Sequence, residues 1–342
     1  MDRVTRITGL LVGTAVGDSL GLPREGLGRR RAARIYGGPL RQRWLLGRGM
    51  LSDDTEHACM TAQALLAAGE DDDDGARFAR SLAWKLRWWL AALPPAIGFG
   101  TLRSLVRAWL GISPSGVRSA GNGAAMRAPI IGAWCDDPDR IAPLVAASTA
   151  ITHRDPRALA GATAIAIAAH HAMSPRLAPA AVLADIHARV AEPELLGALD
   201  RVARALDDRS EPAALADQLG LARGVTGYVN HTVPICLHAW LRAPADIRGA
   251  LERVVALGGD TDTTGAIVGA LAGACAGEAG IPREWLAIAD APRSLAWIRR
   301  LAARVAERGR PLPLAWPIVP LRNIAFLAIA VAHAARRALP PY

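Results

Sequence analysis

The sequence predicts an all-α fold, because apolar residues recur at helical spacing almost throughout and alternating β-branched segments bounded by turn signals are missing. The chain has 342 residues, of which 51% are hydrophobic and 21% are charged. This apolar content is sufficient to bury a large core and excludes an intrinsically disordered chain. We therefore expect a compact multi-helix protein.

Each expected helix has its own pattern. Ile7, Leu10, Leu11 and Thr14 share one face near the start of the chain. The stretch 78–93 repeats apolar positions at three and four residues, and Pro94-Pro95 ends it. Further helices are expected at 158–173, which is almost free of charge and therefore buried, at 180–190, which is amphipathic, and at 267–276, whose small residues allow close packing.

The C-terminal part is expected to be an extension. Residues 308–320 are rich in proline and predict a linker, and 321–342 predict a final helix. We divide the chain into a main domain at 1–293 and a helical extension at 294–342. The most apolar stretch, 324–335, is shorter than the roughly 20 residues that cross a bilayer. A cytoplasmic protein without a membrane partner is therefore expected, since no secretory signal is recognisable either.

Charge and cysteine content exclude several classes of function. The net charge is +9, but Lys85 is the only lysine and the arginines are scattered apart from Arg29-Arg30-Arg31. A nucleic-acid partner is therefore not expected. The four cysteines lie far apart and predict no zinc site. The acidic run at 70–74 lacks the alternating spacing of an EF-hand and is interpreted as a solvated loop before a helix.

Two clusters of carboxylates and hydroxyls lie next to apolar helices. The first is Ser52-Asp53-Asp54-Thr55, and the second lies at 258–265 and contains Asp260, Asp262 and Thr263. Oxygen ligands of this kind suit hard cations such as Mg²⁺. Each cluster alone is also typical of an ordinary helix N-cap, so the hypothesis of one metal site depends on the fold bringing the two together.

Two glycine-rich turns are candidates for phosphate binding. One contains Ser119, Gly121, Asn122 and Gly123 and is expected to lead into a helix, and the other contains Gly98, Gly100 and Thr101. Backbone amides at such a turn can hold phosphate, although most glycine-rich turns are only turns. By composition alone Glu25 is interpreted as a loop residue, and His153 as a helix cap or core residue.

In this order, these segments resemble the ADP-ribosylglycohydrolases of the dinitrogenase-reductase-activating type. The resemblance rests on Gly13 to Glu25, Ser52 to Thr55, Gly98 to Thr101, Gly121 to Arg127, Thr152-His153 and Gly258 to Thr263. It covers roughly residues 5 to 280. It implies an orthogonal all-α fold, two Mg²⁺ ions with Mn²⁺ as a substitute, and an ADP-ribosylated protein as substrate.

The resemblance also implies roles for individual residues. It makes Ser52, Asp53, Asp54, Asp260, Asp262 and Thr263 metal ligands. Gly98, Gly100, Thr101, Ser119, Gly121, Asn122, Gly123 and His153 would line the ADP-ribose pocket. Glu25, Asp53 and Asp54 are the catalytic candidates, and the sequence does not choose which of them is the base.

The expected activity is magnesium-dependent removal of ADP-ribose from protein side chains, with arginine as the favoured linkage. The closing segment resembles bacterial relatives, some of which reverse ADP-ribosylation by toxins. Two alternatives stay open. One is a Mg²⁺-dependent phosphohydrolase of ADP-ribose-like or nucleotide substrates, and the other is an inactive ADP-ribose-binding relative.

Overall fold

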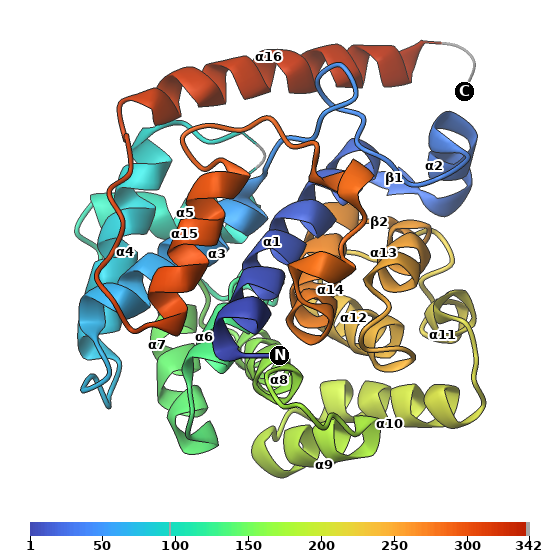
Figure 1. Ribbon diagram of the computed structural model, residues 1–342, viewed down its shortest axis with the longest axis horizontal. Coiled ribbons are helices and arrows are strands. Elements are labelled where there is room, and N and C mark those ends of the chain that lie inside the picture. Colours follow the sequence, from blue (N-terminus) through green and yellow to red (C-terminus); the bar gives the residue numbers. More distant parts are fainter. Residues whose placement is uncertain (96, 340–342) are drawn as a thin grey trace.

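The computed structural model describes residues 1–95 and 97–339, which form sixteen α-helices and two very short strands (Figure 1). This confirms the all-α prediction. The strands β1 (Leu27–Gly28) and β2 (Gly258–Gly259) pair antiparallel, with Leu27 opposite Gly259. They were not predicted, because two residues are too few to give an alternating pattern. They join two loops that lie far apart in the sequence.

Helices α1 (Arg3–Gly21) and α14 (Thr261–Ala276) form the centre of the molecule. Glycines recur every fourth residue along both contact faces, at positions 9, 13, 17 and 21 of α1 and at 265, 269 and 273 of α14. The pair is antiparallel, since Gly9 faces Gly273 and Gly17 faces Gly265. A Cβ atom on Gly13 would lie 2.1 Å from the carbonyl oxygen of Gly269. The two backbones are therefore in direct contact, as the small residues at 267–276 predicted.

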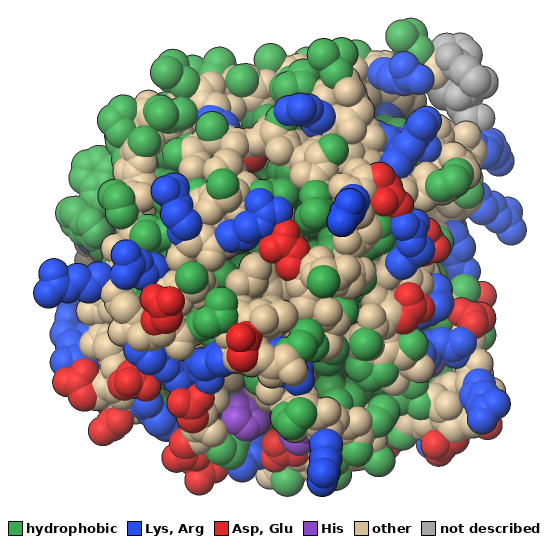
Figure 2. All heavy atoms as spheres, in the orientation of Figure 1, with side chains coloured by type: hydrophobic (Ala, Val, Ile, Leu, Met, Phe, Trp, Pro, Cys, Tyr) green, Lys and Arg blue, Asp and Glu red, His purple; other side chains and the backbone are tan. Residues whose placement is uncertain are grey.

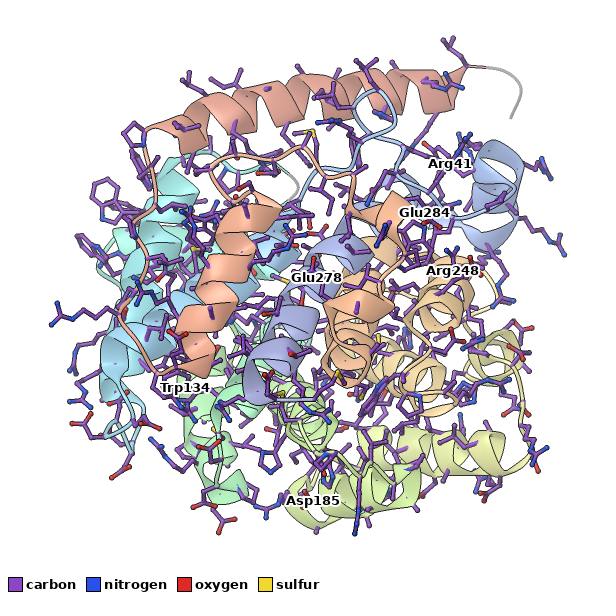
Figure 3. The ribbon with its side chains drawn as sticks, viewed as in Figure 1. Arg41, Trp134, Asp185, Arg248, Glu278 and Glu284 are labelled. Atoms are coloured by element: carbon purple, nitrogen blue, oxygen red, sulfur yellow. The ribbon has the colours of Figure 1, made fainter. Side chains whose placement is uncertain are left out.

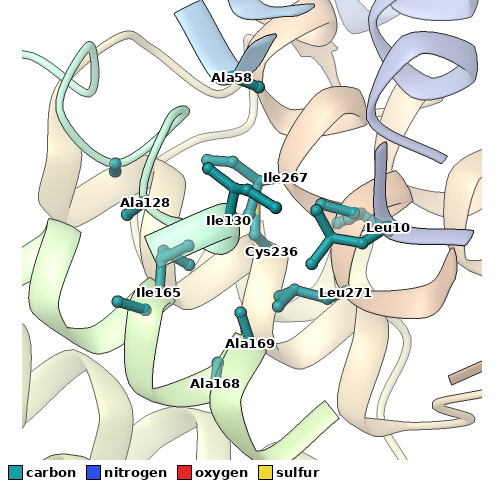
Figure 4. Close-up of a cluster of buried hydrophobic side chains, with 14 of the residues drawn as sticks. Leu10, Ala58, Ala128, Ile130, Ile165, Ala168, Ala169, Cys236, Ile267 and Leu271 are labelled. Atoms are coloured by element: carbon teal, nitrogen blue, oxygen red, sulfur yellow. The ribbon is translucent and has the colours of Figure 1, made fainter. Parts of the chain in front are cut away.

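The remaining helices surround this pair. Those nearest to it are α3 (Asp53–Ala68), α6 (Pro129–Trp134), α8 (Pro156–Ala172), α12 (Val229–Leu241), α13 (Ile247–Val255) and α15 (Leu295–Ala306). Figure 4 shows how Leu10, Ile130, Ile165 and Leu271 meet in one buried cluster, although they come from four different helices. Burying such side chains is the main stabilising contribution, at roughly 25 cal/mol per Å² of apolar surface.

The outer helices are α2 (Arg29–Tyr36), α4 (Ala76–Ala91), α5 (Phe99–Trp109), α7 (Ile141–Thr152), α9 (Pro179–Arg189), α10 (Pro193–Asp207) and α11 (Pro212–Gln218). Ion pairs lie on the surface of the molecule. Arg248 of α13 and Glu284 lie together in Figure 3, and the distance from nitrogen to oxygen is 2.5 Å. Asp185 and Arg189 form a pair within α9 at 2.7 Å. Exposed pairs of this kind contribute little, about 1 kcal/mol at most.

The acidic run before α4 is only partly a solvated loop. Asp72 is buried, and its carboxylate accepts hydrogen bonds from the backbone N–H groups of Arg77 at 3.0 Å and Phe78 at 2.8 Å. These are unpaired donors of the first helical turn. The last acid of the run, Asp74, also accepts from the backbone N–H of Ala76 at 2.9 Å. The run therefore stabilises the start of α4 through its last carboxylate, as predicted, and also through the buried Asp72.

The final helix, α16 (Ile318–Ala338), lies across one edge of the molecule (Figure 1). It has 21 residues and is long and apolar enough to cross a membrane. Only 22% of the residues in its most apolar stretch are buried. The apolar stretch predicted from the sequence, 324–335, was therefore too short. Arg322 and His333 interrupt the run of apolar residues in the sequence, but in the structure both side chains face inward. Helix α15 packs against α1 in the common core, and a division of the chain at residue 293 stays a prediction.

Candidate active site

A cavity of about 790 Å³ opens between the loops at the ends of the central helices. Its walls come from five segments that are distant in the sequence, at 25–28, 98–101, 119–126, 223–227 and 259–263, together with Asp53 and His153. The volume lies within the range of ligand pockets in proteins, roughly 300 to 1,000 Å³.

One end of the cavity is lined by Glu25, Asp53, Asp260 and Asp262. The antiparallel contact of α1 with α14 places the N-terminus of α14 beside the C-terminal end of α1, and the N-terminus of α3 lies next to both. Ser52 is the N-cap of α3, as expected, and its hydroxyl also lies 3.2 Å from the buried carboxylate of Asp54. Thr263 donates to the same Asp54 oxygen at 3.3 Å. The fold therefore brings the two predicted clusters together.

Asp18 is a further acid at this end, which the sequence analysis did not select. It is fully buried in α1 and accepts hydrogen bonds from the backbone N–H groups of Ser52 at 2.9 Å and Thr55 at 3.2 Å. Burial raises the pKa of Asp18 to about 6, because desolvation outweighs these hydrogen bonds. The only signal in the sequence was a charged residue within an apolar, glycine-spaced helix.

The acids at this end raise one another's pKa. Burial and then repulsion by neighbouring carboxylates raise the pKa values of Asp53, Asp54 and Asp262 well above the ordinary range. The same two causes, burial first and Asp260 second, raise the pKa of Glu25 to about 7. So much negative charge in a small volume calls for a positive partner.

The residues present fit a hard cation by their chemistry. Asp18, Asp54 and Asp262 each have a buried carboxylate oxygen with no hydrogen-bond partner in the described part of the chain. A divalent ion would satisfy such oxygens. Within residues 1–95 and 97–339, no three His, Cys, Asp or Glu side chains form a preassembled metal-binding group.

The Gly-Asn-Gly turn differs from its prediction. It does not lead directly into a helix, because several turns follow before α6 begins at Pro129. The side chain of Asn122 points to the acidic end instead, where its amide donates to Asp260 at 2.7 Å and to the hydroxyl of Thr232 at 3.0 Å. Asn122 lines the cavity as predicted, but its amide group orients a carboxylate.

The second glycine turn does begin a helix. Gly98 is the N-cap residue of α5 and lines the cavity, and no described atom lies within 4 Å of where its Cβ would be. The first N–H groups of α5 are free to bind an anion there. Gly100 and Gly123 are packed more tightly, since a Cβ atom would lie 2.8 Å from Ser119 Oγ and 3.1 Å from His153 Cε1 respectively.

His153 lies at the C-terminal end of α7 with its ring in the cavity wall. Arg127 donates to the hydroxyl of Thr152 at 2.8 Å, and that hydroxyl lies 2.8 Å from Nδ1 of His153. The hydroxyl therefore links the Arg127 guanidinium to the His153 ring and holds that ring in place. Burial lowers the pKa of His153 to about 4, so the ring is neutral at pH 7.

The sequence analysis missed one whole wall of the cavity, residues 223–227. Val225 pairs with the loop before α14, donating from its N–H to Gly258 at 3.0 Å and accepting from Asp260 at 2.7 Å. Gly224 has a φ of +144° and approaches Gly259 so closely that a Cβ would lie 2.7 Å from its nitrogen. Two glycines in five residues were the only signal in the sequence.

Comparison with known proteins gives a consistent result. The family model described as ADP-ribosylglycohydrolase matches residues 1–313. The ADP-ribosyl-[dinitrogen reductase] glycohydrolase of Rhodospirillum rubrum is 30% identical over 294 residues, which cover 83% of this chain and 90% of that protein. ADP-ribosylhydrolase ARH3 of Xenopus tropicalis is 31% identical over 199 residues, covering 50% of this chain and 56% of that one. A solved structure described as an ADP-ribosylglycohydrolase-related protein complex has a TM-score of 0.66 at 27% identity, covering 90% of this chain and 99% of the other.

Proposed function

Because the chain belongs to the ADP-ribosylglycohydrolase family, we propose that it releases ADP-ribose from modified arginine side chains of proteins in a magnesium-dependent reaction. The observation that supports this proposal is a single cavity with carboxylates at one end and a glycine-lined helix N-terminus at the other. Arginine is favoured because its guanidinium group is cationic and the acidic end of the cavity attracts it.

Ser52, Asp53, Asp54, Asp260, Asp262 and Thr263 are the residues that would hold two Mg²⁺ ions. When bound, such ions supply positive charge for the ribose hydroxyls and for water. Asp18 would support this ligand set, since it fixes the backbone of Ser52 and Thr55. Asn122 would hold Asp260 in one orientation through its 2.7 Å hydrogen bond.

The bond to be broken joins C1 of the ribose to a nitrogen of the arginine. Positive charge develops on the sugar as the bond breaks, and the carboxylates that line the cavity stabilise it. The guanidinium group leaves with the bonding electron pair as a neutral guanidine. A water molecule adds to C1 and loses its proton to a carboxylate, and that proton passes to the guanidine, so that free ADP-ribose and a protonated arginine side chain result. Glu25 and Asp53 line the cavity, whereas Asp54 lies behind its wall. We therefore assign the role of base to Glu25 or Asp53 and a supporting role to Asp54.

The pyrophosphate would lie at the opposite end, against Gly98, Gly100 and the N-terminus of α5. The free N–H groups of that helix and its dipole both favour negative charge. Nε2 of the neutral His153 ring faces Gly100 and Gly121 at this end of the cavity. A location in the cytoplasm and a role in reversing toxin action stay predictions.

The test compares peptides that carry ADP-ribosyl-arginine or ADP-ribosyl-serine, with and without Mg²⁺, and separates the products by chromatography. We expect free ADP-ribose from the arginine peptide and loss of turnover after chelation. Release of AMP or phosphate would instead support the phosphohydrolase alternative. Binding of ADP-ribose without turnover of either peptide would support an inactive relative.

Glu25→Gln tests the assignment of the base. We expect it to bind ADP-ribose and to lose about a hundredfold or more in single-turnover rate. The matched control is Glu307→Gln, because Glu307 is exposed and makes no ion pair within the described residues. A Glu25→Gln rate within about threefold of the parent would transfer the role to Asp53.

A further inference from the structure

The outer face of α16 is apolar along almost its whole length. Leu321, Ile324 and Val331 are 68%, 65% and 60% exposed. Between residues 318 and 335 the only charged side chain is Arg322, which is buried. Figure 2 shows the result as a row of hydrophobic side chains along the edge that α16 occupies. Exposed apolar surfaces of this extent usually mark an interaction site.

The apolar face continues into a cluster of tryptophans at the N-terminal end of α16. Trp88 is the centre of the cluster, with its ring centroid 5.7 Å from those of Trp84, Trp109 and Trp316. All four side chains are exposed to solvent, Trp84 most of all. Tryptophans are enriched where a protein meets the lipid–water interface, because one end of the ring is apolar and the other is polar.

Basic residues lie at the opposite end of the helix. Arg30 and Arg34 on α2 and Arg336 on α16 are exposed, and none of them makes an ion pair with a residue that the structure describes. The two helices are in contact there, since Arg31 donates to the carbonyl oxygen of Arg337 at 2.9 Å. These three guanidinium groups give the face a positive margin. Such a margin is complementary to anionic lipid headgroups.

Polar contacts on the inner face hold α16 against the body of the protein. Arg322 lies 2.6 Å from Asp290, Asn323 donates to the carbonyl oxygen of Ala92 at 2.8 Å, and His333 lies 3.0 Å from that of Trp44. A helix held in this way cannot cross a bilayer without breaking these bonds. It can lie parallel to a membrane surface with its apolar side immersed.

We propose that the outer face of α16, the tryptophan cluster and the three arginines together form a docking surface for an anionic membrane. Helix α16 lies outside the part of the chain that matches the family model, residues 1–313. None of the residues of this surface lines the cavity of the candidate active site. This proposal replaces the sequence-based expectation that no membrane partner exists. It also stands independently of the proposed hydrolase activity.

The experiment is cosedimentation of the full chain with vesicles of phosphatidylcholine, either alone or with about 30% phosphatidylglycerol. We expect binding to the anionic vesicles that weakens as salt is raised. The combined variant Ile324→Glu with Leu327→Glu should lose about tenfold or more of the vesicle affinity, because two immersed side chains become charged. Leu159→Glu on α8 is the matched control and should bind like the parent.

A second variant separates the charge contribution from the apolar one. Arg30→Gln, Arg34→Gln and Arg336→Gln combined should lower affinity for anionic vesicles, by about fivefold per arginine, and should reduce its salt dependence. All of these positions are exposed, and circular dichroism with thermal melting verifies that the variants fold.

Three results would overturn the proposal. They are absence of binding to anionic vesicles, equal binding by the Ile324→Glu/Leu327→Glu variant, and a dimer in sedimentation equilibrium that the same variant dissociates. The last result would assign the face to a second copy of the chain.

Discussion

The side chain of Asn122 connects the glycine-lined part of the cavity with its acidic part. Its position in a glycine-rich turn suggested contact with phosphate, yet its amide donates to Asp260 and Thr232. The residue lies where the glycine-lined part of the cavity meets its acidic part. A change at Asn122 is therefore expected to disturb the carboxylates as well as the substrate pocket.

Gly98 offers a sharper test of the phosphate end. Its φ of −59° suits any residue, and the described atoms leave the space around a new Cβ empty. Gly98→Ala and Gly98→Val should therefore fold with little change in stability. Both should weaken ADP-ribose binding, valine more than alanine, because the new side chain occupies the cavity. Each tenfold loss of affinity corresponds to about 1.4 kcal/mol of binding free energy. Calorimetry that finds equal affinities for all three proteins would contradict this assignment.

At the scale of elements, the contact between α1 and α14 determines where the acids lie. Asp18 belongs to the last turn of α1, and Asp260 and Asp262 stand at the start of α14. Backbone-to-backbone contact leaves no flexible side chain that could absorb a shift between the two helices. The geometry of the acidic end therefore depends on the glycines of this interface, although none of positions 9, 13, 265, 269 and 273 lines the cavity.

Gly269→Ala tests this dependence. The added Cβ would lie 2.1 Å from the carbonyl oxygen of Gly13, so the helices must separate. We expect a loss of about 3 kcal/mol in the free energy of unfolding. Gly197→Ala in the interior of α10 is the matched control, because nothing lies within 4 Å of its Cβ. It should stabilise the protein by up to about 1 kcal/mol. Urea unfolding of both variants measures the difference.

The sequence alone predicted those elements whose burial is visible in a local pattern. The uncharged run of α8 and the small residues of α14 are examples, and both clusters of acids were found because hydroxyls and carboxylates gather at helix starts. Asp18 and the segment 223–227 were missed, because their importance comes from contacts with distant parts of the chain. The exposure of α16 was also not foreseen, since an apolar face looks the same in a sequence whether it is covered or not.

At the scale of the whole molecule, buried histidines make stability depend on pH. His238 in α12 is fully buried, and burial lowers its pKa to about 4. An unfolded chain binds a proton at this residue below about pH 6.5, whereas the folded protein does not. The contribution of His238 to stability is therefore fully present above about pH 6.5 and decreases as the pH falls toward 4.

His238→Leu removes this contribution. Between pH 7 and pH 5 the parent should lose about 2 kcal/mol more of its free energy of unfolding than the variant does. His57 and His153 are retained in both proteins, so the difference isolates one residue. Equal pH dependence of the two proteins in urea titrations would show that His238 is not neutral when folded.

The position of α1 and α14 near opposite ends of the chain has a consequence during synthesis on the ribosome. Helix α1 emerges first, but its glycine face finds its partner only after the chain has been made as far as α14, which ends at Ala276. Until then the apolar residues that flank those glycines are not buried against α14. A nascent chain or a truncated fragment that lacks α14 is therefore expected to bind chaperones. The acidic end of the cavity cannot form before α14 has been made, because Asp260 and Asp262 belong to the start of that helix.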